Sequence, residues 1–155
     1  MTQKIMAASE GIKPISDRNQ VRVIVKAVVR ATEAWDLTAT EAAVLFDIPL
    51  ATWNRMRSAT FNGNLDRDKV TRASLIVGIY KGLRLSFNGP LTKSWPTLPN
   101  KGDFFGGRSP VEIMISGGIL SMTRVLQHID ALLGYEPDCR QNSWPRHQAE
   151  QPSLV

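Results

Sequence analysis

Residues Leu37–Arg57, LTATEAAVLFDIPLATWNRMR, constrain the fold of this chain more than any other segment. They predict two short helices, the first capped by Thr38 or Thr40 and the second ending near Ser58. Pro49 fits at or just before the first turn of the second helix, because the N–H that proline lacks would have no partner there. Two short helices joined by a tight turn can place one helix in a groove, so the segment favours DNA binding over catalysis.

The spacing of apolar residues divides this helix pair into an inner and an outer face. Ala43 lies where the two helices would cross, and only a small side chain allows a close approach. The residues with the spacing to form a small core beneath are Phe46, Ile48, Trp53 and Met56. The candidate DNA-binding residues are those left facing outward or at the edge, namely Leu50, Ala51, Thr52, Asn54 and Arg55, with Arg57 placed to meet phosphate.

The outward residues have the chemistry to read base edges. Asn54 can pair bidentately with adenine, and Arg55 can do so with guanine. Leu50 or Ala51 can contact a thymine methyl group. Asp47 stands at the turn, where glycine is common; aspartate tolerates the left-handed conformation, although its charge is unfavourable near DNA. The alternative is a plain helical hairpin that only packs within a bundle.

The totals of the sequence set limits without naming a function. The 155 residues suit one medium domain or two small ones, and the net charge of +5 favours a polyanionic partner. The charge is spread, however: residues 1–60 carry eight Lys/Arg against six Asp/Glu, and residues 61–155 carry eleven against eight. The lone Cys139 suits a reducing compartment, and no apolar run could span a membrane. We therefore expect a cytoplasmic protein.

A helix of about residues 17–35, capped by Ser16, is predicted before the pair. Its apolar residues recur at three- and four-residue steps and give one buried face. On another face, four cations follow at strict four-residue intervals, and we call this set the basic stripe: Arg18, Arg22, Lys26 and Arg30. The stripe is either a solvated surface or a contact for phosphate or an acidic partner.

Two further helical segments follow the pair. Leu65 to about Phe87 is apolar on more than one side, so this helix is buried or shared with a partner. Ser109-Pro110 begins the last segment, which Gly117-Gly118 interrupts and Gly134 ends. Residues 88–108 are rich in Pro and Gly, yet Trp95, Phe104 and Phe105 are expected to pack into the core. No strand alternation is present, and the predicted fold is all-α.

The second half of the chain resembles a known family. The runs LDRDKVTRASLIVGIYKGL and FFGGRSPVEIMISGGILSMTRVLQHIDALLG, with Trp95 and Pro99-Asn100 between them, resemble the toxin-binding domain of Xre-type antitoxins of the Xre/MbcA/ParS group. With the helix pair in front, the resemblance covers about residues 18–134. It implies a helix-turn-helix domain at 16–60 and a toxin-binding domain at 61–134, flanked by a frayed N-terminus at 1–15 and a tail at 135–155.

Antitoxins of this group are usually partnered with RES-domain toxins, which deplete NAD. The resemblance implies that the chain blocks the active site of a cognate RES-domain toxin and represses its own promoter by binding operator DNA. We expect a homodimer or a larger hetero-oligomer with the toxin, because symmetric regulators usually bind inverted half-sites. The candidate toxin-binding residues are Trp95, Gly106, Gly107 and Arg108, together with Tyr135, Arg140 and Trp144 of the tail.

No catalytic constellation is recognisable, and we expect neither an enzyme nor a cofactor or metal. One cysteine with His128 and His147 cannot build a structural zinc site of the usual kind. The Gly106–Arg108 segment lacks the ending of a phosphate loop and predicts a tight turn. Two alternatives stay open: a stand-alone transcription regulator with a helical dimerisation domain, and an interaction module that binds no DNA.

Overall fold

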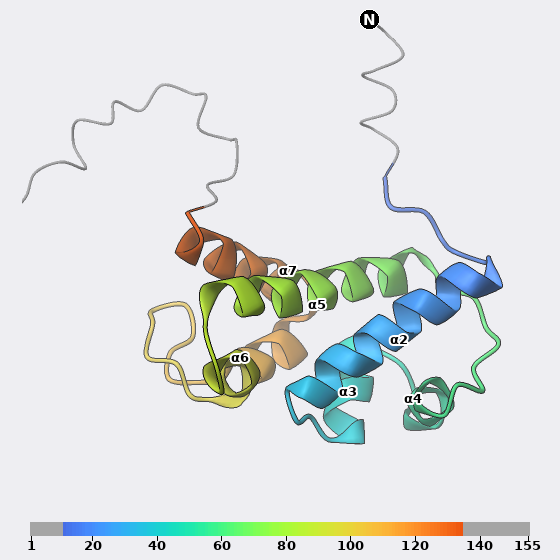
Figure 1. Cartoon of the computed structure of the whole chain (residues 1–155), viewed down its shortest axis with the longest axis horizontal. Coiled ribbons are helices and arrows are strands. Elements are labelled where there is room, and N and C mark those ends of the chain that lie inside the picture. Colours follow the sequence, from blue (N-terminus) through green and yellow to red (C-terminus); the bar gives the residue numbers. More distant parts are fainter. Residues whose placement is uncertain (1–10, 135–155) are drawn as a thin grey trace, which may run out of the picture.

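The computed structural model describes residues 11–134 of the chain, and this part is built from helices. In chain order the elements are α2 (Arg18–Ala34), α3 (Ala39–Phe46), α4 (Leu50–Arg57), α5 (Arg67–Ser86), α6 (Leu91–Ser94), the 3₁₀ helix η1 (Trp95–Thr97) and α7 (Pro110–Leu132) (Figure 1). Within the described residues the one extended pairing is an isolated bridge between Ile15 and Leu65. The all-α prediction is confirmed.

α2 begins one residue later than the sequence indicated. The Asp17 carboxylate accepts a hydrogen bond from the Gln20 N–H at 2.9 Å, so Asp17 is the N-cap and the prediction of Ser16 was wrong. Both residue types cap helices well, and the backbone register decides between them. The predicted buried face is confirmed, with Val25, Val28 and Trp35 in the core.

α3 and α4 begin and end where their local signals predict. Thr38 and Glu41 form a reciprocal capping box at the start of α3. Asp47 ends α3 in the left-handed conformation, with φ 57°, as the turn requires. Pro49 is the N-cap of α4, which runs to Arg57.

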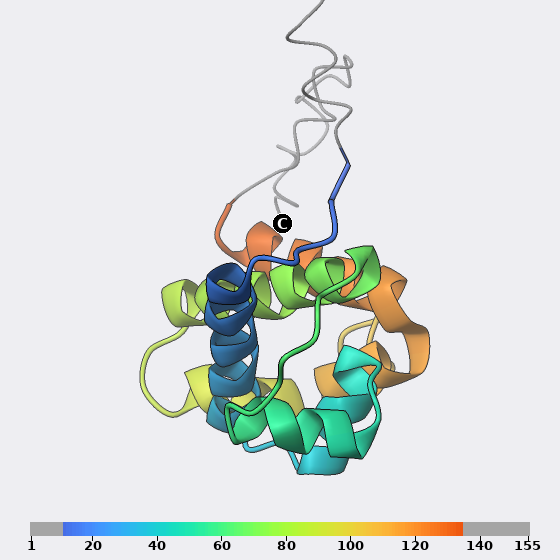
Figure 2. The same ribbon diagram turned by 90° about the vertical axis from the view of Figure 1, so that its right-hand side faces the viewer.

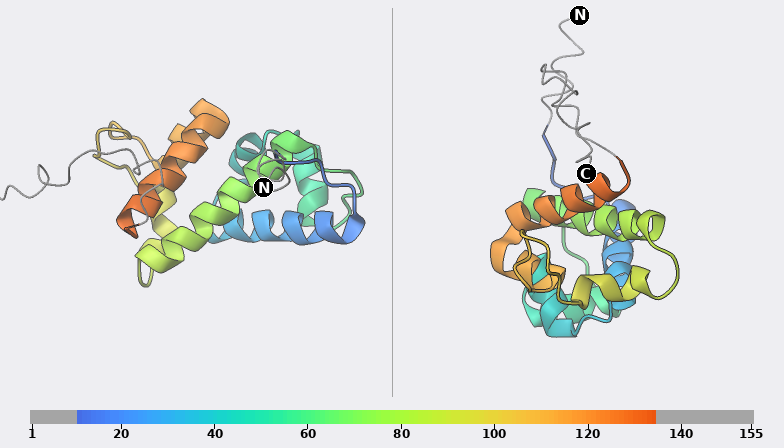
Figure 3. Two further views of the ribbon diagram at one scale, coloured as in Figure 1. Left: turned by 90° about the horizontal axis from the view of Figure 1, so that it is seen from above. Right: turned by 90° about the vertical axis from the view of Figure 1, so that its left-hand side faces the viewer.

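α5 is the central helix of the described chain. It packs against α2 on one side and α7 on the other, and Figure 3 shows it between these two helices. Gly82 of α5 allows close contact with α7, because a β-carbon there would lie only 2.6 Å from Cγ2 of Ile129. Figure 2 shows that the helices enclose one common interior. The largest fully buried side chains in it are Trp35, Phe46, Trp53, Leu65, Ile76, Ile79, Leu83, Phe105, Met114, Met122 and Ile129, with Leu45.

α7 has the predicted start and the predicted interruption. Ser109 and Glu112 form a capping box, and Pro110 takes the first helical position. Gly118 leaves helical geometry, with φ 64° and ψ −147°, and the helix bends there (Figure 3). Few residues other than glycine adopt this conformation, which explains why glycine interrupts the apolar pattern at this position.

Candidate nucleic-acid interface

The rotation of α4 about its axis is set by two buried side chains. Trp53 and Met56 have exposed fractions of 1% and 5%. The Trp53 ring meets the Phe46 ring edge to face, with 6.4 Å between centroids, so α4 is locked against α3. Ala43, where the helices cross, is also buried. The predicted inner face of the helix pair is therefore confirmed, with Ile48 partly buried against the same core.

The opposite face of α4 is open to solvent. Leu50 is 44% exposed, Ala51, Asn54 and Arg55 are exposed, and Thr52 lies at the edge. The Arg55 guanidinium donates a hydrogen bond to the Thr52 hydroxyl at 3.2 Å. This exposed contact holds the guanidinium along α4 without consuming its remaining donors. The predicted outward residues lie together on one face, and their contact with DNA stays a prediction.

Arg57 differs from the other candidates because it already has an anionic neighbour. Its Nε atom lies 3.8 Å from a carboxylate oxygen of Glu33 on α2. About half of each side chain is exposed, so the pair contributes little to stability and exchanges readily for a phosphate contact. The four cations of the basic stripe are also exposed, on α2.

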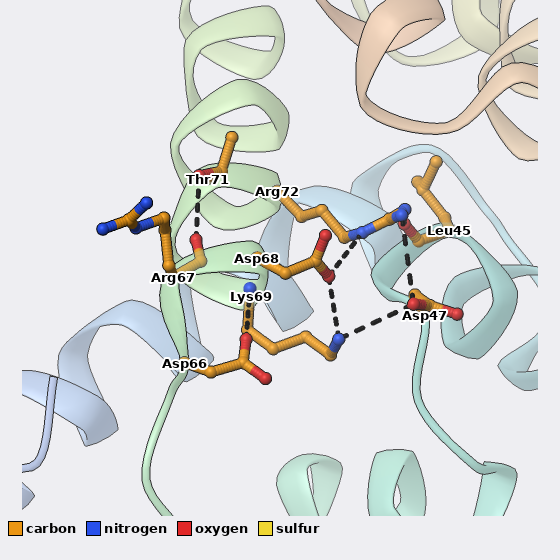
Figure 4. A network of polar contacts seen from close by, with 8 residues as sticks. All are labelled: Leu45, Asp47, Asp66, Arg67, Asp68, Lys69, Thr71 and Arg72. Carbon is orange, nitrogen blue, oxygen red and sulfur yellow. Dashed lines mark hydrogen bonds and ion pairs between the residues drawn. The ribbon is translucent and has the colours of Figure 1, made fainter. Parts of the chain in front are cut away.

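Two cations of α5 lie near Asp47, whose charge at the turn is unfavourable for DNA binding. The Lys69 ammonium lies 3.7 Å and the Arg72 guanidinium 4.0 Å from its carboxylate (Figure 4). Both cations also bind Asp68, Lys69 at 2.8 Å and Arg72 at 3.0 Å. The cluster thus has two cations and two carboxylates, and the two longer contacts of Asp47 are screened by solvent because 67% of its side chain is exposed.

Arg72 also ties the turn to α5 through the backbone. Its Nη1 atom donates a hydrogen bond to the Leu45 carbonyl, at 3.0 Å, in the last turn of α3 (Figure 4). Helix-terminal carbonyls lack an intrahelical partner, so this bond satisfies one of them. Only 13% of the Arg72 side chain is exposed. We call Asp47, Asp68, Lys69 and Arg72 the turn cluster.

The turn cluster shifts the titration of one carboxyl group. Burial alone would raise the pKa of Asp68, but hydrogen bonds and positive charge from Lys69 and Arg72 together hold this pKa below its usual value. Sequence reasoning missed Lys69 and Arg72. The available signal was the four-residue spacing of Asp68 and Arg72, but nothing local indicates that Arg72 reaches Leu45, 27 residues away.

Three of the four predicted toxin-binding residues in the described chain, Gly106, Gly107 and Arg108, form a turn before α7. Gly106 and Gly107 have φ values of 58° and 85° and are exposed. The Gly107 N–H donates to the Asn100 carbonyl at 2.9 Å, and Arg108 donates to the Ser116 hydroxyl at 3.2 Å. The tight-turn interpretation is thus confirmed, and the exposed glycines and Arg108 remain candidates for a protein contact.

Trp95, the fourth candidate toxin-binding residue in the described chain, is buried. The residue is 9% exposed, and its ring stacks on His128 at 6.1 Å and meets Phe105 edge to face at 5.9 Å. The expectation that Trp95 packs in the core is confirmed, and the structure does not support it as a toxin contact. Burial of His128 beside these rings lowers its pKa. Tyr135, Arg140 and Trp144 lie outside the described residues.

Two classes of site have no candidates in the described chain. Within residues 11–134, no three His, Cys, Asp or Glu side chains are grouped closely enough to hold a metal ion. Over the same residues, none of the helices combines the length and apolar character needed to cross a membrane.

Comparison with known proteins gives one family match and one relative. The family model described as the antitoxin Xre-like helix-turn-helix domain matches residues 15–78, which include α2 to α4 and the turn cluster. The uncharacterised protein y4oB of Sinorhizobium fredii (strain NBRC 101917 / NGR234) is 33% identical over 126 residues, which cover 80% of this chain and 95% of the relative. No solved structure matches the chain.

Proposed function

Because the chain belongs to the Xre-type antitoxins, a family of DNA-binding regulators, we propose that it binds operator DNA through α4 and neutralises a RES-domain toxin. The observation that carries the DNA-binding half is the division of α4 into two faces. Trp53 and Met56 are held in the core, while Asn54 and Arg55 are held in solvent on the opposite face. A helix presented in this way can enter the major groove with two bidentate side chains toward the bases.

Binding to the protein's own promoter tests this half. The affinity of the full chain for a duplex from that promoter is measured by fluorescence anisotropy at several salt concentrations. Replacing Arg55 by alanine removes one bidentate contact, and affinity is expected to fall by about 1–3 kcal/mol. Arg67→Ala, on the exposed start of α5, is the matched control and should bind as the wild type does. Equal affinities for all three proteins, or no salt dependence, would refute the assignment.

The toxin-binding half concerns the second part of the chain. We propose that the turn of Gly106, Gly107 and Arg108 contacts the toxin, and that the tail carrying Tyr135, Arg140 and Trp144 obstructs its NAD cleft. The support is the exposure of the turn together with the resemblance of residues 60–134 to the toxin-binding domain of these antitoxins, since the matching family model ends at residue 78. The complex is proposed to contain a homodimer of the chain and to act in the cytoplasm as a repressor.

Co-expression tests this half. The product of the neighbouring gene is expressed alone, with the full chain, and with a chain ending at residue 134. We expect toxicity alone, protection and co-purification with the full chain, and weaker protection with the shortened chain. A harmless neighbour that does not co-purify would leave the alternative, a stand-alone regulator with a helical dimerisation domain. Full protection by the shortened chain would refute the role of the tail.

A further inference from the structure

Two grooves flank α2, and the one between α2 and α5 has the features of a docking site. It encloses about 630 Å³. Its lining residues come from these two helices alone and are Ala27, Arg30, Val77, Tyr80, Lys81, Arg84 and Leu85. We call this surface the α2–α5 groove. All of these residues lie in the C-terminal halves of α2 and α5.

The groove presents apolar surface that the monomer leaves uncovered. Leu85 is 74% exposed, the largest exposed fraction among the large apolar side chains that the structure describes. Val77 and Tyr80 are partly exposed beside it. Exposed apolar surface that is grouped in a concave site and rimmed by charge is typical of a surface that binds another protein.

The charges of the groove all have one sign. Arg30, Lys81 and Arg84 line it, and none of its lining residues is acidic. The Arg84 guanidinium lies 5.8 Å from the centre of the Tyr80 ring, so positive charge is held directly over apolar surface. A segment that matches both the charge and the apolar surface of the groove must carry carboxylates and apolar side chains on the same face. We propose that the α2–α5 groove binds an acidic amphipathic segment of a partner protein.

Other occupants fit the groove less well. A second copy of the groove would bring the same three cations and would be repelled. Duplex DNA would satisfy the cations but offers little apolar surface to Leu85 or Tyr80. The groove also lies on the flank of α2 away from α4: the groove on the other flank is lined by Lys26, Met56 and Arg57 among others, and borders the proposed DNA surface. The inference is separate from the proposed function, because it holds whichever protein supplies the acidic amphipathic segment.

A synthetic peptide serves as the probe. It is a helix-forming sequence of about 18 residues that carries a row of leucines bordered by glutamates on the same face, and its twin carries glutamine in place of glutamate. Binding to the full-length protein is followed by fluorescence anisotropy. We expect saturable binding of the acidic peptide and affinity lower by about tenfold for the neutral twin.

Charge-reversal variants locate the binding site. Lys81→Glu with Arg84→Glu should lower the affinity for the acidic peptide by about tenfold or more. Arg22→Glu with Lys26→Glu changes the net charge equally on the other flank of α2 and should change the affinity less than about threefold. Leu85→Ser tests the apolar contribution without changing charge and should weaken binding several-fold.

Three outcomes would overturn the inference. The first is that the acidic peptide shows no saturable binding. The second is that both charge-reversal variants lose the same peptide affinity. The third is that the Lys81→Glu/Arg84→Glu protein loses promoter binding but keeps its affinity for the peptide. The Arg55→Ala promoter measurement is independent of all three, so failure of this inference is distinguishable from failure of the proposed function. Circular dichroism of each variant shows whether its helices are retained.

Discussion

Replacing Arg72 by methionine is expected to destabilise the protein by about 2 kcal/mol. Arg72 donates to the Leu45 carbonyl at 3.0 Å and to Asp68 at 3.0 Å, and only 13% of its side chain is exposed. A hydrogen bond from a charged group to a shielded acceptor contributes about 1.5 kcal/mol or more. The Asp68 contact adds roughly 0.5 kcal/mol, because that carboxylate is partly exposed and keeps its bond to Lys69. Methionine retains most of the apolar packing of the arginine stem.

Urea denaturation followed by circular dichroism measures this loss. About 2 kcal/mol corresponds to a melting temperature lower by about 8 °C in a domain of this size. Arg67→Met is the matched control: its side chain is exposed on the same helix and points away from the turn cluster in Figure 4. We expect the control to stay within about 0.5 kcal/mol of the wild type.

The alternative outcome is physically reasonable and would refute the reasoning. Replacing both members of a buried ion pair by apolar residues is sometimes neutral or stabilising, but Arg72→Met removes one member only, and Asp68 keeps its contact with Lys69. If Arg72→Met unfolds at the wild-type urea concentration, the bond to Leu45 contributes no net stability, and the turn cluster does not hold α3 against α5. A double-mutant cycle with Asp68→Asn separates the two contacts: a coupling of about 0.5 kcal/mol is expected if the Leu45 bond dominates.

Three further predictions follow from the packing of α5 and α7. Gly82→Ala should lower the free energy of unfolding in urea by about 1–3 kcal/mol, because the new β-carbon would lie 2.6 Å from Ile129. The control is Gly78→Ala, whose β-carbon would lie 3.4 Å from the flexible end of a leucine, and this change should be neutral or stabilising. Gly118→Ala should lower the free energy of unfolding by about 1–3 kcal/mol by the same measurement, because alanine rarely adopts the φ of 64° and ψ of −147° found there. An unchanged urea midpoint would mean that the kink relaxes. The free energy of unfolding should fall as the pH drops below about 6.5 because of His128. Its pKa is lower in the folded protein than in the unfolded chain, so the unfolded chain takes up the proton first. His128→Phe should remove this pH dependence between about pH 5 and 7, and an unchanged pH profile would contradict the assignment.

Much of the fold follows from local signals. Ser109 starts its helix as predicted, Thr38 is one of the two caps predicted for α3, and Asp47 takes the left-handed turn. These features depend on a few neighbouring residues, because hydrogen bonds within one helical turn satisfy the end of the helix whatever lies further away. The same holds for the two faces of α4, which follow from a 3.6-residue period and two large apolar side chains.

Long-range packing decided what the pattern left open. The choice of Asp17 over Ser16, the burial of Trp95, and the reach of Arg72 to a carbonyl in α3 all depend on where distant segments meet. Residue spacing describes one element at a time, and it cannot specify which element lies against a side chain.

By itself, the sequence determined that the chain is helical, where α3, α4 and α7 begin, and which side of α4 faces outward, because each depends on interactions within one or two helical turns. Only the tertiary structure decided that two cations of α5 lie beside the turn next to the proposed DNA surface and that a cationic groove lies between α2 and α5. Both arise from the packing of segments that are distant along the chain, and such contacts form only when the whole core is assembled.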